Sequence, residues 1–293
     1  MFQLKQQTFA VALSFGKNRT TNDVLITAPT MSIFIRKDGK FTKIYSHPAS
    51  KFLTKIDCSA TKEAGYVAFV NTIREFDLKP EQLSKQGSQV LRITLSASGE
   101  PQVEDFQKFA RLNQNNVRLW SRESSIYLMF SYNTDASSDL NICTVYKLGE
   151  TFFDRIDKLP CQNARVIEFF TVHHDLMLLI GNYQGNNGTT NTFSTIMRYD
   201  LNQKAFVEHQ KISTEAIAVG KYFYLDHRDQ RQHFLFVGNS FEVGEFGLIN
   251  YEVPSMIYKL VNGFFIPMQT INVKHIQAML PIAVSFCLCT GTV

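Results

Sequence analysis

A short, strand-like segment occurs five times along this chain and restricts the folds that the chain can adopt. Each copy places apolar residues around one basic residue, and aligning that residue separates the copies by 56, 55, 51 and 61 positions. The five basic residues are Arg36, Arg92, Lys147, Arg198 and Lys259. Near-constant spacing over five copies indicates a repeat architecture, and strand-rich repeats of similar length are typical of propeller blades.

Each copy is followed by three more segments with the character of β-strands. The last of the three is the most apolar, as in Leu176 to Ile180, and such continuous aliphatic runs suit strands that are buried on both faces. The composition agrees, because 25 Phe and 11 Tyr favour strands over helices. We therefore predict an all-β fold, a β-propeller of four-stranded antiparallel blades, with about five blades in this chain.

The period continues along the whole chain and so predicts a single repeat domain over residues 1–293. The approximate repeat starts are residues 31, 88, 142, 193 and 254. Residues 8–15 resemble a fourth strand, and we expect them to form the outer strand of a preceding or closing blade. The last blade is then composite or incomplete. The alternative is a truncated chain, because residues 286–293 lose the polar turn and gain two cysteines.

Charge and hydropathy restrict the partners. The formal net charge is +4 over 293 residues, and no Lys/Arg run of the kind that follows phosphates is present, so we expect no nucleic-acid partner. No window reaches the roughly 18 apolar residues of a transmembrane helix, so we expect no membrane insertion. The first 15 residues lack the length of apolar core and the cleavage site of a signal peptide.

The cysteines and two sequence triplets bear on the compartment. Cys143 and Cys161 fall in one repeat and could pair, which leaves at least one of the five cysteines over. Asn18 and Asn187 begin Asn-x-Thr triplets and are possible N-glycosylation sites. Both features are compatible with a secreted glycoprotein.

The fifth copy carries the clearest signature, in which an aromatic and a basic residue precede a turn and a Phe and a Gln follow it. The signature residues of the last two copies are Arg198, Phe206, Gln210, Tyr258, Lys259, Phe265 and Gln269. With Ser255 and Ile257 before the turn and Ile271 after it, this pattern resembles the EAR (epitempin, EPTP) repeat. That repeat forms the β-propeller of the leucine-rich glioma-inactivated proteins and occurs in the thrombospondin-type laminin G and EAR protein.

The resemblance has consequences for function. It implies a secreted, extracellular module whose propeller faces bind receptor or matrix proteins without catalysis. It assigns no contact residues, because the match lies at structural positions.

A search for catalytic chemistry finds no nucleophile elbow, zinc-protease motif or phosphate loop. We therefore predict that the chain is not an enzyme and has no catalytic residues, no cofactor and no metal site. One alternative is a propeller-type enzyme resembling a glycoside hydrolase, which needs paired carboxylates about 5 to 10 Å apart. Another is a non-functional, truncated fragment of a larger EAR protein.

Three polar features have both a structural and a functional interpretation. His173-His174-Asp175 is expected to form a turn, although it could supply metal ligands or a base. Residues 226–233 are expected to form a solvated loop, although Arg228 and Arg231 could bind an acidic or phosphorylated partner. The five recurrent basic residues could ring one propeller surface, but we expect each to pair locally.

Overall fold

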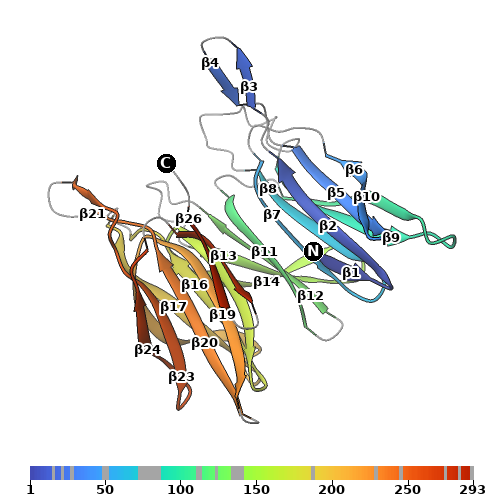
Figure 1. The fold of residues 1–293 in the computed structure, drawn as a ribbon. Helices are drawn as coiled ribbons and strands as arrows, with labels where there is room; N and C mark the ends of the chain where they lie inside the picture. Colours follow the sequence, from blue (N-terminus) through green and yellow to red (C-terminus); the bar gives the residue numbers. More distant parts are fainter. Residues whose placement is uncertain are drawn as a thin grey trace. The chain divides into compact units, whose positions relative to one another are not determined.

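The structure is a computed structural model, and its elements are β-strands (Figure 1). Most of them form five four-stranded antiparallel sheets, each built from a continuous stretch of chain. The described residues are 1–14, 17–20, 23–26, 30–47, 53–71, 87–109, 114–122, 125–132, 142–185, 189–227, 230–243, 247–273, 276–282 and 285–290. The predicted fold class, an all-β propeller with four-stranded antiparallel blades, is confirmed.

The strands of the five sheets follow one another in chain order, apart from two short hairpins inserted between them. The first sheet contains β1 (Phe2–Leu4), β2 (Gln7–Ser14), β5 (Thr30–Lys37) and β6 (Lys40–Ser46). The second contains β7 (Leu53–Ala60), β8 (Gly65–Asn71), β9 (Ser88–Leu95) and β10 (Pro101–Phe109). The third contains β11 (Gln114–Arg122), β12 (Ser125–Tyr132), β13 (Ile142–Leu148) and β14 (Phe153–Pro160).

The remaining sheets follow the same plan. The fourth contains β15 (Ala164–Val172), β16 (Asp175–Asn182), β17 (Asn191–Asp200) and β18 (Ala205–Glu215). The fifth contains β19 (Ile217–His227), β20 (Gln230–Asn239), β23 (Ser255–Val261) and β24 (Phe264–Ile271). Three two-stranded sheets pair β3 (Lys17–Thr20) with β4 (Asp23–Ile26), β21 (Glu242–Val243) with β22 (Ile249–Asn250), and β25 (Ile276–Ile282) with β26 (Ser285–Thr290).

The sheets are offset from the predicted repeats by two strands. Each predicted repeat start coincides with the third strand of a sheet, so a sheet combines the end of one repeat with the beginning of the next. β2 accordingly pairs with both β1 and β5, as the second strand of the first sheet, where we expected an outer strand. The reason is that a repeat period fixes the spacing of equivalent strands but does not say which four of them hydrogen-bond together.

The first two strands of the second to fifth sheets share one irregularity. In each pair the register shifts after the first residue of the leading strand, as between Ala164 and Val166 on β15. Such a shift marks a β-bulge, which inserts one extra residue and increases the local twist. The β25–β26 pair has the same shift between Ile276 and Ala278. Its backbone is therefore a further copy of these leading hairpins.

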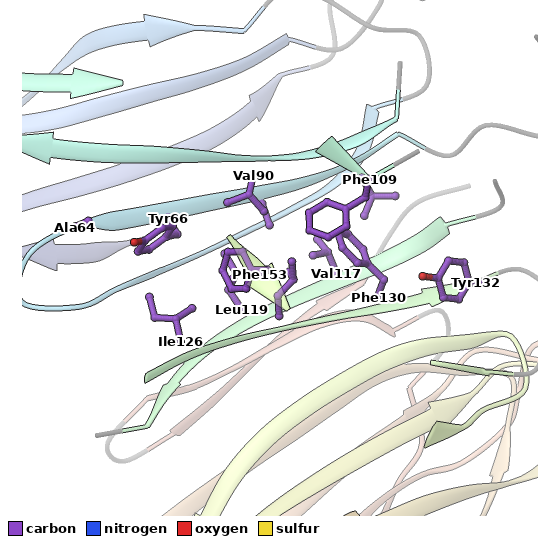
Figure 2. Close-up of a cluster of buried hydrophobic side chains, with 13 residues drawn as sticks. Ala64, Tyr66, Val90, Phe109, Val117, Leu119, Ile126, Phe130, Tyr132 and Phe153 are labelled. Carbon is purple, nitrogen blue, oxygen red and sulfur yellow. The ribbon is translucent and has the colours of Figure 1, made fainter. Parts of the chain in front are cut away.

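The chain divides into two compact units. The first comprises Met1–Asp135 and Cys143–Lys158, and the second comprises Ala136–Ile142 and Leu159–Val293. Within each unit, neighbouring sheets bury apolar side chains against each other. In the first unit Phe109 of the second sheet and Phe130 of the third pack with ring centroids 5.0 Å apart (Figure 2). In the second unit Leu179 and Phe265 belong to one cluster between the fourth and fifth sheets.

The expectation that the most apolar strands are buried on both faces is confirmed. All seven residues of β8 are buried, as are seven of the eight residues of β16. The structure describes the side chains of three of the five cysteines. Cys143 and Cys161 are disulfide-bonded, whereas Cys58 is a free thiol whose pKa is raised by burial.

Candidate functional site

The five recurrent basic residues lie on the third strands of the five sheets, β5, β9, β13, β17 and β23. Two of them make defined local contacts. Arg92 forms an ion pair with Glu104 on β10, and its guanidinium lies 5.3 Å from the centroid of the Phe106 ring. Lys147 Nζ lies 5.8 Å from the ring centroid of Tyr127. At these two positions the contacts are those of local pairing, as expected for long side chains with an apolar stem.

The recurrent glutamines lie on the fourth strands, and two of them join neighbouring sheets. Gln210 Oε1 accepts the backbone N–H of Phe265 at 2.9 Å, and its Nε2 donates to the Phe265 carbonyl at 2.8 Å. Gln107 makes the same two bonds to Phe153, at 2.7 and 3.3 Å. Each side chain thus satisfies both backbone groups of a residue on an outer strand. Gln269 has the equivalent register on β24 and is exposed.

Other signature residues are structural as well. Phe206 and Tyr258 are buried, and burial raises the pKa of the Tyr258 hydroxyl. Ser255 Oγ accepts the N–H of Asn239 at 3.2 Å, and the Asn239 carboxamide donates to the carbonyl of Pro254 at 2.8 Å. Asn239 Oδ1 also accepts the N–H of Glu215, the last residue of the preceding sheet, at 3.0 Å.

This Asn-Ser contact recurs, although sequence reasoning noticed only parts of it. Asn182 N–H donates to Ser194 Oγ at 3.1 Å, and Asn71 N–H donates to Ser88 Oγ at 3.2 Å. The signal in the sequence was an Asn at the end of the most apolar strand, with a Ser within the first four residues of the strand that pairs with it.

Two ion pairs join the first strands of neighbouring sheets. Lys221 Nζ lies 2.7 Å from Glu168 Oε1, and the Glu168 side chain is only 8% exposed. Arg118 Nη1 lies 3.5 Å from Asp57 Oδ2. All four residues are fifth in their strands and have the same register after the bulge. The sequence conceals this equivalence, because acidic and basic residues alternate at the position.

Two polar segments that sequence analysis treated separately meet at one pocket, here called the turn pocket. The prediction of a solvated loop over residues 226–233 is wrong for the described residues, because Asp226 lies on β19, Arg231 and His233 lie on β20, and His233 is buried. The volume of the turn pocket is about 810 Å³. The end of β15 and its turn contribute Thr171 and His173, and the β19–β20 hairpin contributes Tyr222, Tyr224, Asp226, Arg231 and His233. The two hairpins share their register after the bulge, and β15 packs beside β19, so the end of the β15–β16 hairpin lies against the side of the longer β19–β20 hairpin. Arg228 lies outside the described residues.

A hydrogen-bond chain fixes the state of His233 at the floor of the turn pocket. Tyr222 donates its hydroxyl hydrogen to the Thr171 carbonyl at 3.0 Å, and its oxygen lies 2.6 Å from His233 Nδ1. Nδ1 therefore carries a hydrogen and donates it to Tyr222. Burial, and then the neighbouring His173 and Arg231, lower the pKa of His233, so the ring is neutral near pH 7 and its Nε2 is an acceptor.

The rest of the turn pocket is aromatic and balanced in charge. The Tyr222 ring stacks on Phe170 with centroids 4.7 Å apart, and burial raises the pKa of Tyr222 to about 12. Arg231 Nε binds Asp226 Oδ1 at 3.0 Å. The Arg231 guanidinium also lies 3.9 Å from the ring centroid of Tyr224, a side chain that is 46% exposed. One cation and one anion therefore neutralise each other at the rim.

A second surface is formed by the connection between β20 and β23, and is called here the hairpin surface. It consists of the exposed apolar side chains of Val243, Leu248, Ile249 and Tyr251. Val243 and Ile249 are opposite each other in the β21–β22 pair, and Figure 1 shows β21 at one end of the fifth sheet. Val243 N–H donates to Thr190 Oγ1 at 2.8 Å, which ties the hairpin to the residue just before β17 of the fourth sheet.

An aromatic row supports the hairpin surface. Tyr251 contacts Phe241 with ring centroids 6.0 Å apart, and Phe241 contacts Tyr183 at 5.7 Å. The guanidinium of Arg165 lies 3.4 Å from the Tyr183 centroid. The exposed Tyr251 is therefore held by a chain of packed rings.

The predictions about glycosylation, metal sites and membrane insertion concern residues or features on which the structure gives limited information. Asn18 lies on β3, where side chains are not described, and Asn187 lies outside the described residues. Among the residues that the structure describes, no three or more His, Cys, Asp or Glu side chains are grouped as a metal site would require. Within the same part of the chain, no helix is long and apolar enough to span a membrane.

No protein-family model matches the chain. No curated protein matches it either. Similar solved structures include the fission yeast SREBP–SCAP binding domains, with a TM-score of 0.50, 10% identity, and coverage of 97% of this chain and 78% of that one. A Bombyx mori GH32 beta-fructofuranosidase has a TM-score of 0.45 and 8% identity, over 91% of this chain and 61% of the enzyme. The chain therefore spans less than two thirds of that enzyme.

An inulosucrase from Halalkalicoccus jeotgali has a TM-score of 0.45 and 8% identity, with 89% of this chain and 82% of the enzyme covered. These comparisons correct the prediction that the chain is not an enzyme, because folds like this one are found in enzymes. The prediction failed because it relied on missing linear motifs, whereas propeller sites gather residues from separate blades. At these identities the likeness shows the fold alone, and a fold does not imply an activity.

Proposed function

We propose that this chain is an extracellular propeller that binds another protein, of the cell surface or the matrix, through the hairpin surface. The observation that carries the proposal is the clustering of four large exposed apolar side chains on one short hairpin. Leu248 is 72% exposed and Ile249 is 52% exposed. Clustered apolar side chains of this kind typically mark protein interaction sites, and rigid scaffolds commonly present such loops.

The support beneath the hairpin surface favours a tight interface. Tyr and Arg are enriched among residues that dominate binding energy, and an anchor that is already packed loses little conformational entropy on binding. The row from Tyr251 to Arg165 supplies such an anchor. Partner contacts would therefore centre on Tyr251 and Leu248.

Two further observations support the proposed location and partner class. The disulfide-bonded Cys143 and Cys161 suit an oxidising, extracellular compartment. The resemblance to the EAR repeat implies a secreted module whose partners are receptors or matrix proteins.

The proposal is tested by probing an array of receptor ectodomains and matrix proteins with the folded chain. We expect a partner whose binding is weakened at least tenfold by Leu248→Asp, because a charge would be buried in the interface. Leu201→Asp is the matched control, since Leu201 is also 72% exposed but lies in the β17–β18 turn. The proposal fails if the two variants bind equally well.

A catalytic function resembling that of a glycoside hydrolase is the second candidate. The turn pocket gives it a location, because the Asp226 carboxylate and the His173 imidazole both line one hollow. Asp226 is the one carboxylate among the described lining residues, so the carboxylate pair of the usual mechanism is not seen in them. Incubation with a panel of glycosides, followed by measurement of released reducing sugar, tests it. Turnover that disappears in Asp226→Asn would support this candidate, and the absence of turnover across the panel would exclude it for that panel.

A further inference from the structure

The turn pocket contains a buried acceptor that the folded chain leaves without a hydrogen bond. His233 is 5% exposed, and its Nε2 has no partner among the described residues. Because Nδ1 donates to Tyr222, a neutral ring presents a lone pair at Nε2. An unpaired buried polar group of this kind costs about 1–3 kcal/mol, which a bound O–H donor would recover.

One exposed side chain packs against the ring that carries this acceptor. The His173 ring lies edge to face against His233, with centroids 5.0 Å apart. His173 is exposed and belongs to the turn between β15 and β16, so its side chain has room to rotate. Rotation of His173 would open Nε2 to the hollow without disturbing the Tyr222 hydrogen bonds.

The charges of the turn pocket select the class of ligand. Among the described lining residues, Arg231 is already paired with Asp226 and His233 is neutral, so these residues offer no excess of positive charge for a phosphate or carboxylate. The same residues offer no excess negative charge for a cationic ligand either. Asp226 still has free acceptor capacity and the Arg231 guanidinium has further N–H donors. A neutral ligand that both donates and accepts hydrogen bonds fits this arrangement.

The walls add an apolar requirement. Tyr224 is 46% exposed, and the Arg231 guanidinium lies over its ring. Hydroxyl groups alternating with C–H surfaces, as on a pyranose or furanose ring, satisfy aromatic and polar walls together. A hollow of about 810 Å³ is large enough for a short oligosaccharide.

We propose that the turn pocket binds a neutral saccharide, with one sugar hydroxyl donating to His233 Nε2 after His173 moves aside. Other hydroxyls bind Asp226 and Arg231, and the C–H surface of the sugar contacts Tyr224. This site is separate from the hairpin surface and does not rest on the protein-binding proposal. It also requires no turnover, so binding without hydrolysis supports it while excluding the catalytic candidate.

The test compares two substitutions of one residue, using a panel of uncharged mono- and oligosaccharides. His233→Asn keeps a polar atom near the Nδ1 position but removes the Nε2 acceptor, whereas His233→Gln places an acceptor near the Nε2 position. We expect saccharide binding, measured by saturation-transfer NMR and calorimetry, to weaken about tenfold or more in His233→Asn. His233→Gln is expected to retain most of the affinity. Thermal unfolding of both variants confirms that the fold is kept.

Three results would overturn the proposal. The first is that no neutral saccharide binds the wild-type chain at millimolar concentration. The second is equal binding by folded His233→Asn and wild type. The third is that inorganic phosphate, zinc or an unmodified peptide competes for the pocket more strongly than any saccharide, as read from the imidazole resonances of His173 and His233.

Discussion

β18 and β24 are the fourth strands of neighbouring sheets and carry the same Phe and Gln signature, but their surroundings differ. Gln210 on β18 is half-buried and clamps the backbone of Phe265 in the next sheet. Gln269 on β24 has the same register and is exposed. Beside it, Phe264, Ile266 and Met268 are each at least 47% exposed. The signature is therefore found both on a strand that contacts a neighbouring sheet and on a strand whose equivalent residues are exposed.

The glutamine side chains that form hydrogen bonds therefore join two neighbouring sheets and do not link strands within their own sheet. The Gln107–Phe153 contact, in the other unit, repeats the same geometry. A glutamine in the same local pattern can thus bind a neighbouring strand at one position and be exposed at another. Four measurements follow, in order of decreasing expected effect.

The largest effect is expected from Phe265→Ala. The side chain is fully buried between the fourth and fifth sheets and lies 5.9 Å from the Phe170 centroid. Its removal should lower the free energy of unfolding by about 3–5 kcal/mol, measured by urea denaturation. Phe264→Ala is the control, because Phe264 is 47% exposed. Comparable losses in both variants would contradict the distinction between the two faces of β24.

Gln210→Leu is expected to have the next largest effect. It leaves the N–H and the carbonyl of Phe265 without their partners and should cost about 1–3 kcal/mol, as should Gln107→Leu at Phe153. Gln269→Leu should change stability by less than about 0.5 kcal/mol. Chemical denaturation of the three variants side by side tests the comparison directly. A large loss in Gln269→Leu would show that β24 is covered in solution.

Ile266→Lys should alter solubility more than stability. An exposed apolar outer strand invites association, and a lysine on such a strand opposes it. We expect the onset of light scattering to move to higher protein concentration, with a stability change within about 0.5 kcal/mol. Leu201→Lys, in an exposed turn, should leave the onset nearly unchanged. Equal shifts would mean that β24 is not the associating surface.

The smallest effect concerns Glu215, the last residue of β18. Burial, and then the neighbouring Glu242, raise the pKa of this carboxyl in the folded chain above its usual value of 4.5. The folded state therefore holds the proton to higher pH than the unfolded state, so the free energy of unfolding falls as pH rises from 4.5 through the raised pKa. Glu215→Gln should remove that fall. Parallel curves for the two proteins would refute the assignment.

Much of the candidate site lay in the sequence without being recognisable as a site. The turns around His173 and His233 were each visible as polar interruptions between apolar strands. The two hairpins come together because neighbouring sheets repeat the same register, although two strands, β17 and β18, lie between them in the sequence. A local sequence pattern cannot predict a contact between segments so far apart in the chain. The lone pair of His233 likewise follows from the hydroxyl of Tyr222 and the carbonyl of Thr171, which only the fold brings together.

The strand content, the repeat length and the equivalent Gln positions follow from the sequence alone, because alternating and apolar runs reflect local burial and a period reflects equivalent environments. Which four strands share a sheet depends on the tertiary structure, since hydrogen bonding between strands is non-local. The tertiary structure also decided that Gln210 is a clamp while Gln269 is exposed. The side chain is the same in both places, and its role depends on whether another strand presents a free N–H and carbonyl opposite it.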